Sequence, residues 1–471
     1  MALLLFMTLA AWSMGSAVGS SPDEDYVLTS IWCGTEGNPP YCRKDPDQAS
    51  SFIVSELVAR PQFCYVNQGA DYSASCQRGM AENTVATSRL NKCNSNSDCV
   101  YPKRYFETQM RFVSIDIEKS VLTMRIFNCI ICAVLVIASA QISNLRNLDA
   151  VLVWLTLATP FSFWIIASVN TTSWAIIGTS AIGFSLVNVN YGNFLMPQNF
   201  YPLVSSTFGL IVAVSSRRES TEITLLLIAI ALICYKFEKE TTNLSSQSRN
   251  RFHIPIVVLS LTTLIFYQFR DLISFEMTNI SLLGENLIEL PKFFLGIHGS
   301  WGLGWFETFL PQISWIFANQ AFLLIIYFHL KSASSKKRKL IALVLALNLM
   351  GMLFVTTYSG FRIGSVIQPR YFLPFVIPSL AFVLSRSGVR VPAKIFKTVC
   401  ILIAISNSIA LRATIQRYTS GNDHFLFESL NETVEWWWNF GPNPEFVWIA
   451  GSMSFIAFLL VLAHIRESMI N

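Results

Sequence analysis

The sequence is poor in charged residues and in histidine. Of its 471 residues only 13% are Asp, Glu, Lys or Arg, whereas a soluble domain carries about 25%. Its net charge of +5 is spread thinly along the chain, which excludes a nucleic-acid-binding face. The five histidines are scattered, and this argues against a histidine metal site or a catalytic triad. The glycine-rich nucleotide motifs, the zinc-protease motif and the serine-hydrolase motif are missing as well.

Apolar residues, in contrast, are abundant: 52% of the chain is hydrophobic and the mean hydropathy is +0.46. They occur in blocks of about 18 to 22 residues, the length that crosses a bilayer as a helix. The sequence therefore predicts an all-α polytopic membrane protein with about twelve spans. The expected spans are residues 2–20, 119–141, 149–168, 174–190, 199–215, 221–236, 254–268, 310–330, 340–358, 371–385, 396–411 and 446–465.

The connecting loops differ in their content of Lys and Arg. Residues 331–339 (KSASSKKRK) and 386–397 (RSGVRVPAKIFK) are rich in basic residues and contain no acidic ones. Because basic residues collect in cytoplasmic loops, we expect these two loops and both termini to lie inside. Arg217 and Arg218 then fall on the outer side, so this pair marks either an error in the layout or a site. The outer loops would be 21–118, 269–309 and 412–445.

The chain divides into a first transmembrane helix at 1–20, an extracytoplasmic loop at 21–118 and a multi-helix transmembrane domain at 119–471. The first segment has small residues near Ala17 and resembles a cleavable signal peptide in that respect. It has no basic residue before its apolar stretch, which is long enough to span. We therefore expect it to be retained as the first helix.

Six of the ten cysteines fall in the loop 21–118. An even number of cysteines in a polar, external segment predicts a disulfide framework. Six cysteines allow 15 pairings, and we expect the nearest-neighbour one. A zinc site is disfavoured because the loop contains no histidine. The four cysteines in predicted spans, including Cys129 and Cys132, are expected to be small core residues. The expected pairs are Cys33–Cys42, Cys64–Cys76 and Cys93–Cys99.

Three carboxylates, Asp23, Glu24 and Asp25, follow the first apolar segment directly. Carboxylates this close together repel one another, which raises a pKa or recruits a cation. At a membrane surface they can accept a proton from a hydroxyl group or hold a divalent ion against a phosphate. The alternative is structural, with Asp23 capping a following helix.

Arginines stand at the mouths of predicted spans. Arg370 lies in QPRYFLP between Gln368 and Tyr371, where a charge entering the membrane needs a partner or an anion. Its planar guanidinium group suits a phosphate, and Arg217 and Arg218 can contribute to the same anion-binding site. The alternative for these arginines is contact with lipid head groups.

The segment HGSWGLGWFETFLP at 298–311 is rich in Gly and Trp and contains Trp305 and Glu307. Tryptophan at this position usually anchors a helix at the membrane surface, but its ring also serves as a platform for sugars. The run 436–438 (WWW) has the same two interpretations, and anchoring is favoured for it.

Four motifs in this order resemble a family of bacterial multi-pass membrane proteins of unassigned function that is related to the GT-C glycosyltransferases. They are SPDED at 21–25, Ser168-Val169-Asn170, GWFETFLP and QPRYFLP. The chain departs from the family pattern where Val27 replaces a histidine, where Thr171-Thr172-Ser173 replaces Pro-Asn-Gly and where Pro369 replaces a glycine.

The resemblance implies a GT-C-like fold and transfer of a sugar from a polyprenyl-phosphate carrier to a glycan, lipid or protein of the cell envelope. It implies a plasma (inner) membrane location with the active face outside. Asp23 or Glu24 would act as base, or as ligand of a divalent cation such as Mg²⁺ or Mn²⁺. The loss of the family's histidine puts the metal and full activity in question. The implied substrate contacts are Asp25, Asn170, Arg217, Arg218, Trp305, Glu307, Gln368, Arg370 and Tyr371.

Two other functions stay open at this point. A transporter or flippase of a lipid-linked anion places ionisable residues at mid-membrane and often shows internal repeats. Charges within the predicted spans are nearly absent, with Arg125 near one end, and no repeat is visible. A non-catalytic scaffold that binds a partner through its cysteine-rich loop is the third possibility. An enzyme releases the sugar from its carrier, whereas a flippase leaves it attached.

Overall fold

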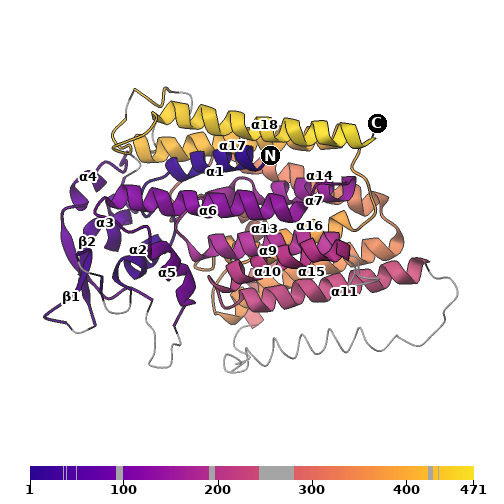
Figure 1. Cartoon of the computed structure of the whole chain (residues 1–471), viewed down its shortest axis with the longest axis horizontal. Coiled ribbons are helices and arrows are strands. Elements are labelled where there is room, and N and C mark those ends of the chain that lie inside the picture. The colour runs from indigo at the N-terminus through magenta and orange to yellow at the C-terminus, as the bar shows by residue number, and fades with distance from the viewer. Residues whose placement is uncertain are drawn as a thin grey trace.

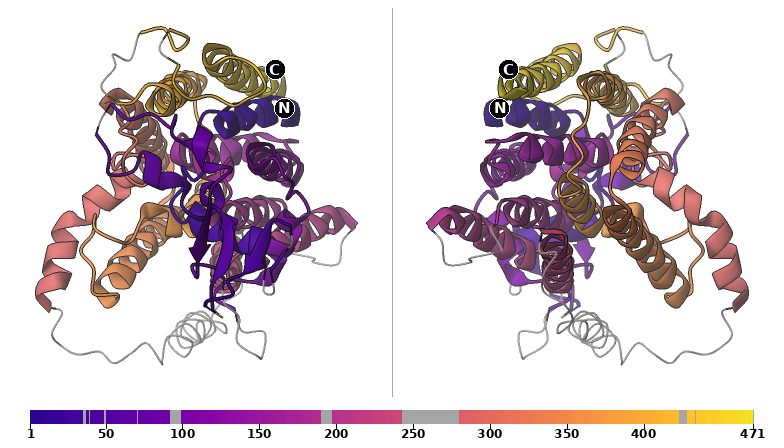
Figure 2. Two further views of the ribbon diagram at one scale, coloured as in Figure 1. Left: turned by 90° about the vertical axis from the view of Figure 1, so that its left-hand side faces the viewer. Right: turned by 90° about the vertical axis from the view of Figure 1, so that its right-hand side faces the viewer.

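The computed structural model describes residues 1–34, 37–38, 40–48, 50–69, 71–91, 99–189, 197–242, 280–422, 428–432 and 434–470. Within these ranges a small α/β part lies at one end of a bundle of long helices (Figure 1). Seen along the helices, the small part covers that end of the bundle (Figure 2). The expected span 254–268 and Cys93 lie outside the described residues.

Most of the described chain is helical. Five helices are long and apolar enough to cross a membrane, namely α6, α14, α15, α17 and α18. Helices α1, α10 and α16 are apolar but shorter. The layout of twelve spans thus stays a prediction beyond these five. The bundle helices are α1 (Ala2–Met14), α6 (Ile117–Ala140), α7 (Leu145–Ala158), α8 (Phe161–Ile166), α9 (Thr171–Asn188), α10 (Phe200–Val214), α11 (Ser220–Thr242), α13 (Ile280–Gly296), α14 (Gln312–Ser332), α15 (Ser335–Tyr358), α16 (Leu373–Ser385), α17 (Ala393–Thr419) and α18 (Pro444–Ile470).

Two expected spans differ from the helices that form. The first helix ends at Met14 rather than at residue 20, and its 13 residues reach only about 20 Å. The expected span 149–168 is two helices, α7 and α8, separated at Thr159 and Pro160. Proline has no backbone N–H to donate and its ring clashes with the preceding turn, so a helix does not continue through it.

Small residues allow the central helices to approach closely. A Cβ atom on Gly178 of α9 would lie 2.3 Å from the carbonyl oxygen of Gly209 in α10. A Cβ atom on Gly183 would lie 2.7 Å from the Cβ of Pro378 in α16. In a membrane the hydrophobic effect does not drive helices together, because lipid is as apolar as the side chains. Close van der Waals packing at small residues therefore contributes much of the association. Helix α9 is therefore held between α10 and α16.

The small part consists of short elements around a three-stranded antiparallel sheet. The strand order is β1-β2-β3, and Arg43 pairs with Ile53, which in turn pairs with Ala86. Two disulfides fasten it, Cys33–Cys42 and Cys64–Cys76, and both were predicted. The elements are α2 (Glu24–Cys33), β1 (Cys42–Lys44), β2 (Phe52–Ser55), α3 (Glu56–Ala59), η1 (Pro61–Cys64), α4 (Gln77–Met80), β3 (Thr84–Thr87) and α5 (Lys103–Met110).

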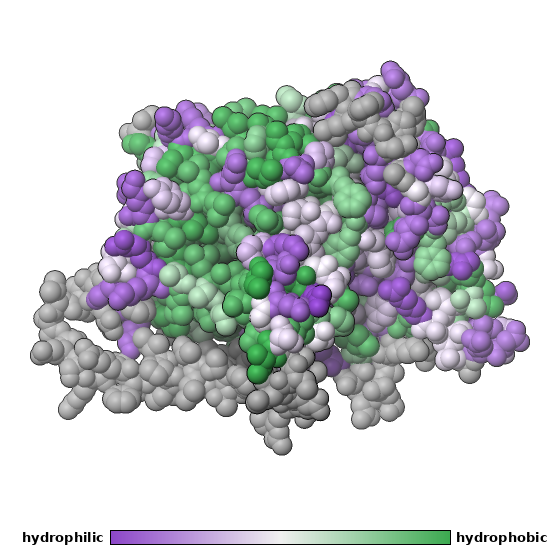
Figure 3. All heavy atoms as spheres, turned by 180° about the vertical axis from the view of Figure 1, so that it is seen from behind, coloured by the Kyte–Doolittle hydropathy of each residue, from purple (hydrophilic) through white to green (hydrophobic). Residues whose placement is uncertain are grey.

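The two ends of the bundle differ in chemistry. We call the end covered by residues 21–118 the cysteine-rich end. The opposite end carries Lys336, Lys337, Arg338, Arg386 and Arg390, and we call it the basic end. Hydrophobic side chains cover much of the helical face between the two ends, as a membrane protein requires (Figure 3).

The tryptophans at 436 and 438 lie inside the protein rather than at its surface. Trp436 is 1% exposed and Trp438 is 4% exposed. The indole N–H of Trp438 donates to the carbonyl oxygen of Met14 at 2.8 Å. The interpretation of these two residues as membrane anchors was therefore wrong, because Trp438 packs at the end of α1 and Trp436 packs against Tyr418 and Trp438.

Candidate functional site

The carboxylate of Asp23 faces away from the helix that it precedes. Asp23 has a φ of +62° and lies just before α2, but its side chain makes no capping hydrogen bond. Instead, Nη2 of Arg370 donates to Oδ2 at 2.5 Å, and Nη2 of Arg89 lies 3.3 Å from Oδ1. The Asp23 side chain is 37% exposed. Asp23 therefore presents a paired but accessible carboxylate.

Arg370 is fixed from several directions. It lies in the turn η5 (Pro369–Tyr371) that leads into α16, and its side chain is only 3% exposed. Besides Asp23 it donates to the carbonyl oxygen of Pro22 at 2.6 Å and to the hydroxyl of Tyr371 at 3.0 Å. A buried guanidinium with these partners does not reach lipid head groups, so the snorkelling alternative is excluded for Arg370.

Asp23 and Arg370 line a small pocket at the cysteine-rich end. Its cavity volume is about 10 Å³, enough for about one water molecule. Arg217, from the loop between α10 and α11, enters it and donates to the hydroxyl of Thr172 at 3.3 Å. The Arg217 guanidinium lies 4.9 Å from the ring centroid of Tyr371 and 5.5 Å from that of Tyr101. The lining residues are Asp23, Tyr26, Val27, Tyr101, Asn170, Thr171, Thr172, Arg217, Arg370 and Tyr371.

Asn170 joins helix α9 to the segment that carries Asp23. Its side-chain oxygen accepts from the N–H of Thr172 at 2.9 Å and caps α9. Its amide donates to the carbonyl oxygen of Pro22 and to the hydroxyl of Ser21, both at 2.9 Å. Five predicted residues, Asp23, Asn170, Arg217, Arg370 and Tyr371, thus meet in one pocket from four distant segments.

Glu24 lies in the opposite environment from its neighbour. Its side chain is fully buried and forms an ion pair with Arg125 of α6, with Nη2 3.0 Å from Oε1. The N–H groups of Ser21 and Val169 donate to its two oxygens at 3.0 and 3.2 Å. Arg125 also donates to three backbone carbonyl oxygens of residues 13–17. Glu24 therefore joins the start of α2 to α6 through Arg125, which in turn holds the chain at the end of α1.

Asp25 is also occupied. Its Oδ2 accepts from Gln62 at 2.8 Å and from Arg89 at 2.6 Å, and its Oδ1 accepts from the N–H of Tyr26. Burial raises the pKa of Asp25 above its ordinary value, although the Arg89 guanidinium acts against this. Asp25 thus holds Arg89, which in turn reaches Asp23 at the rim of the pocket.

The other predicted site residues lie outside the pocket. Arg218 donates to the carbonyl oxygen of Cys99 at 2.5 Å, and Trp305 donates to that of Gly19 at 2.9 Å. Glu307 forms a buried ion pair with Arg417 of α17, with Nε 2.5 Å from Oε2. Burial raises the pKa of Glu307 despite this cation. Gln368 is buried directly before the turn of Arg370.

The donor set does not fit a divalent cation. Within the described ranges no group of three His, Cys, Asp or Glu side chains is arranged to hold a metal ion. Both oxygens of Asp23 face arginines, and those of Glu24 and Asp25 are already taken. A cation here would sit beside two guanidinium groups, which its charge disfavours.

Sequence analysis did not select four residues that shape this region: Tyr26, Arg89, Tyr101 and Arg125. The position of Arg125 could have been informative, since a lone arginine in an apolar span needs a buried partner. The two tyrosines gave no signal, because their approach to Arg217 depends on how α2 and the chain near 101 fold over the helix ends.

The fold and the pocket define a polytopic membrane protein with an arginine-flanked carboxylate at the covered end of its helices. The chain belongs to the family described as "Predicted membrane protein (DUF2142)", whose profile matches residues 6–378. The match includes every residue that lines the pocket and ends within α16. No curated protein and no solved structure matches the chain at a significant level.

Proposed function

We propose that this protein is a GT-C-like membrane glycosyltransferase. It would move a sugar from a polyprenyl-phosphate donor to a cell-envelope acceptor, with its cysteine-rich end on the outer face of the plasma membrane and about twelve spans in all. One observation carries the proposal: the accessible carboxylate of Asp23 shares a pocket with the guanidinium groups of Arg370 and Arg217. A carboxylate accepts protons, and arginine forks bind phosphate.

The chemistry would be a displacement at the anomeric carbon of the sugar. The acceptor hydroxyl oxygen forms the new bond to this carbon while Asp23 takes the hydroxyl proton. The bond between the anomeric carbon and the phosphate oxygen breaks, and its electron pair goes to the departing polyprenyl phosphate. Arg370 and Arg217 offset the charge that grows on this phosphate, the role that preorganised cations serve best in a partly dry site.

Within the acidic cluster the proposal now rests on Asp23. Glu24 has no exposed surface and Asp25 is 2% exposed, so neither can meet a substrate hydroxyl. Pockets that enclose a whole ligand usually measure about 300–1,000 Å³. This one has a cavity volume of about 10 Å³, room for about one water molecule, so it must widen before the reacting groups can enter while the lipid stays outside. No metal ion enters the proposed step.

The test is release of polyprenyl phosphate from synthetic short-chain polyprenyl-phosphate hexoses and pentoses by the purified full-length protein. Removing a general base typically costs a factor of about 10² to 10⁴. Asp23→Asn should therefore abolish measurable release. Asp47→Asn, an exposed carboxylate of the same small part, is the matched control and should keep the full rate.

Two outcomes would refute the proposal. Equal rates for the wild type and Asp23→Asn would remove Asp23 from the reaction. Movement of intact donor across a vesicle membrane without any release of sugar would identify a flippase instead. A folded Asp23→Asn protein, shown by an unchanged size-exclusion profile, is required for the comparison to count.

A further inference from the structure

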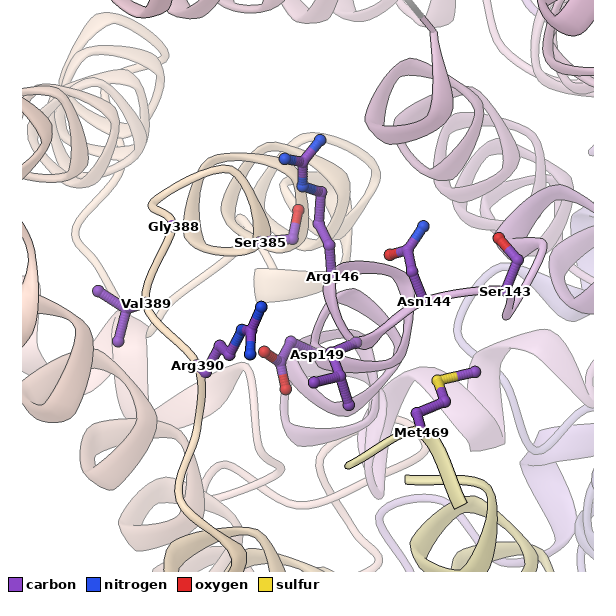
Figure 4. Close-up of a pocket in the computed structure, with 10 residues that line it drawn as sticks. Ser143, Asn144, Arg146, Asp149, Ser385, Gly388, Val389, Arg390 and Met469 are labelled. Carbon is purple, nitrogen blue, oxygen red and sulfur yellow. The ribbon is translucent and has the colours of Figure 1, made fainter. Parts of the chain in front are cut away.

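A second and larger pocket lies at the basic end of the bundle. Its cavity volume is about 660 Å³, against about 10 Å³ for the Asp23 pocket. Its walls come from the turn before α7, the first turns of α7, the segment after α16 and the end of α18 (Figure 4). The lining residues are Ser143, Asn144, Leu145, Arg146, Asp149, Ser385, Gly388, Val389, Arg390 and Met469.

The two pockets are separated by the length of a helix. Helix α16 begins just after Arg370 and ends at Ser385, which lines the second pocket. Helix α6 carries Arg125, the partner of Glu24, in its third turn and ends at Ala140, three residues before Ser143. The helix runs about 23 Å from Arg125 to Ala140, so the two pockets lie well apart. The second pocket therefore serves something other than the proposed sugar transfer.

Positive charge dominates this pocket. Arg146 and Arg390 are exposed and line it, and Asp149 is the only carboxylate among the lining residues. The Asp149 carboxylate and the Arg390 guanidinium point toward each other in Figure 4. Asp149 is 4% exposed and also lies in the field of Arg466, a buried arginine on α18. Two arginines, Arg390 and Arg466, thus act on this one carboxylate, and basic side chains outnumber acidic ones around the pocket.

Neutral groups add further donors for an anion. The N-terminus of α7, a helix of 14 residues, opens at the pocket, and Asn144 caps it by accepting from the N–H of Asn147 at 3.0 Å. Helix N-termini favour anions because their N–H groups and dipole point outward. The hydroxyls of Ser143 and Ser385 line the same space. Leu145, Val389 and Met469 supply an apolar wall beside the polar one.

We propose that this pocket binds the phosphate group of an anionic lipid at the basic end of the bundle. A phosphate diester matches the two arginine forks, and the apolar wall matches the glycerol and upper acyl carbons. Basic pockets between membrane helices on the side of the Lys- and Arg-rich loops recognise such head groups. A free phosphate ion can bind the same arginines, but it has no apolar part to contact the apolar wall.

The experiment measures the thermal stability of the full-length protein in phosphatidylcholine nanodiscs. Short-chain phosphatidylglycerol is titrated in one arm and inorganic phosphate in another. Phosphatidylglycerol should raise Tm in the wild type. In R146Q/R390Q the half-maximal concentration should increase about 30-fold, since each basic residue near a membrane surface contributes about one factor of five. Arg338→Gln, an exposed arginine of the same end that does not line the pocket, should behave as the wild type.

A second variant guards against indirect effects. Ser143→Glu leaves both arginines in place but adds a negative charge to the lining, and it should weaken the response to phosphatidylglycerol as well. An equal response of the wild type, R146Q/R390Q and Ser143→Glu would overturn the proposal. A response to inorganic phosphate alone, lost in the same variants, would keep the phosphate site but assign it to a soluble ion. Failure of the sugar-transfer assay would leave this result untouched.

Discussion

Asp23 and Glu24 are adjacent in the chain, and the structure places them in opposite surroundings. Asp23 is 37% exposed at the rim of a pocket, and its partners are one buried and one half-exposed arginine. Glu24 is fully buried, and its partners are Arg125 and two backbone N–H groups. Asp23 precedes α2 in a left-handed backbone conformation, with φ of +62°, whereas Glu24 is the first residue of the helix, so the two carboxylates leave the backbone in different directions.

A charged residue at a helix end can stabilise the fold through a buried ion pair, or it can remain accessible to a ligand. The exposed fraction of its side chain distinguishes the two roles. A buried ion pair is costly to break by removing one partner, because the charge that remains is buried without its counter-charge. A partly exposed pair costs little to break, because water replaces the partner. The four predictions below test this division in order of decreasing effect.

The largest effect is expected for Arg125→Gln. The change leaves Glu24 charged and buried without its cation and removes donors from the backbone carbonyl oxygens near residue 16. Breaking a buried ion pair by removing one partner costs about 3–5 kcal/mol. We expect a large loss of folded protein in fluorescence size-exclusion profiles and a strongly lowered Tm. Lys119→Gln on the same helix, which breaks the exposed pair with Asp116, should leave both measurements unchanged.

Arg417→Gln should have the next largest effect. It removes the cation from Glu307 and a donor from the carbonyl oxygen of Tyr65. Glu307 keeps hydrogen bonds from Thr308 and Tyr418, so we expect a loss near the lower limit for buried pairs, about 3 kcal/mol. The decrease in Tm checks it. If Tm falls no further than it does for Arg60→Gln, an exposed arginine paired with a residue of its own helix turn, the distinction between buried and exposed ion pairs is contradicted.

Asp23→Asn should cost less stability than Arg417→Gln, because the Asp23 carboxylate is accessible and the buried Arg370 keeps its hydrogen bonds to Pro22 and Tyr371. A modest fall in Tm combined with lost sugar release would separate function from folding at this position. If Asp23→Asn lowers Tm as much as Arg125→Gln does, Asp23 belongs with the structural carboxylates.

The smallest effect concerns pH. Burial raises the pKa of Asp25 above 3.8, so the folded state binds this proton more tightly than the unfolded chain. The favourable contribution is complete below pH 3.8 and is lost as the pH rises through the raised pKa. The Tm of Asp25→Asn should therefore fall less than that of the wild type between about pH 4 and pH 7. Parallel curves for the two proteins would rule this out, and Asp47→Asn should follow the wild type.

Much of the pocket could be predicted because polar residues in a membrane protein are costly in lipid and therefore need partners at the ends of spans or in the interior. Arg370 and Arg217 stand where spans end, and a charge there needs a partner. Asn170 precedes a span, where its side chain caps the helix. The same reasoning failed for Trp305 and Glu307, since nothing local indicates that their partners are Gly19 and Arg417.

The sequence by itself determined the membrane class, the presence of a disulfide-bonded loop and five of the residues that line the pocket. Each of these depends on composition or on short spacing along the chain. Tertiary structure alone decided which of the three acidic neighbours reaches the pocket, that Trp436 and Trp438 are buried, and that two arginines line a second pocket at the far end. These outcomes depend on contacts between helices that are distant in sequence, and burial, rather than residue type, decides which charges water can reach.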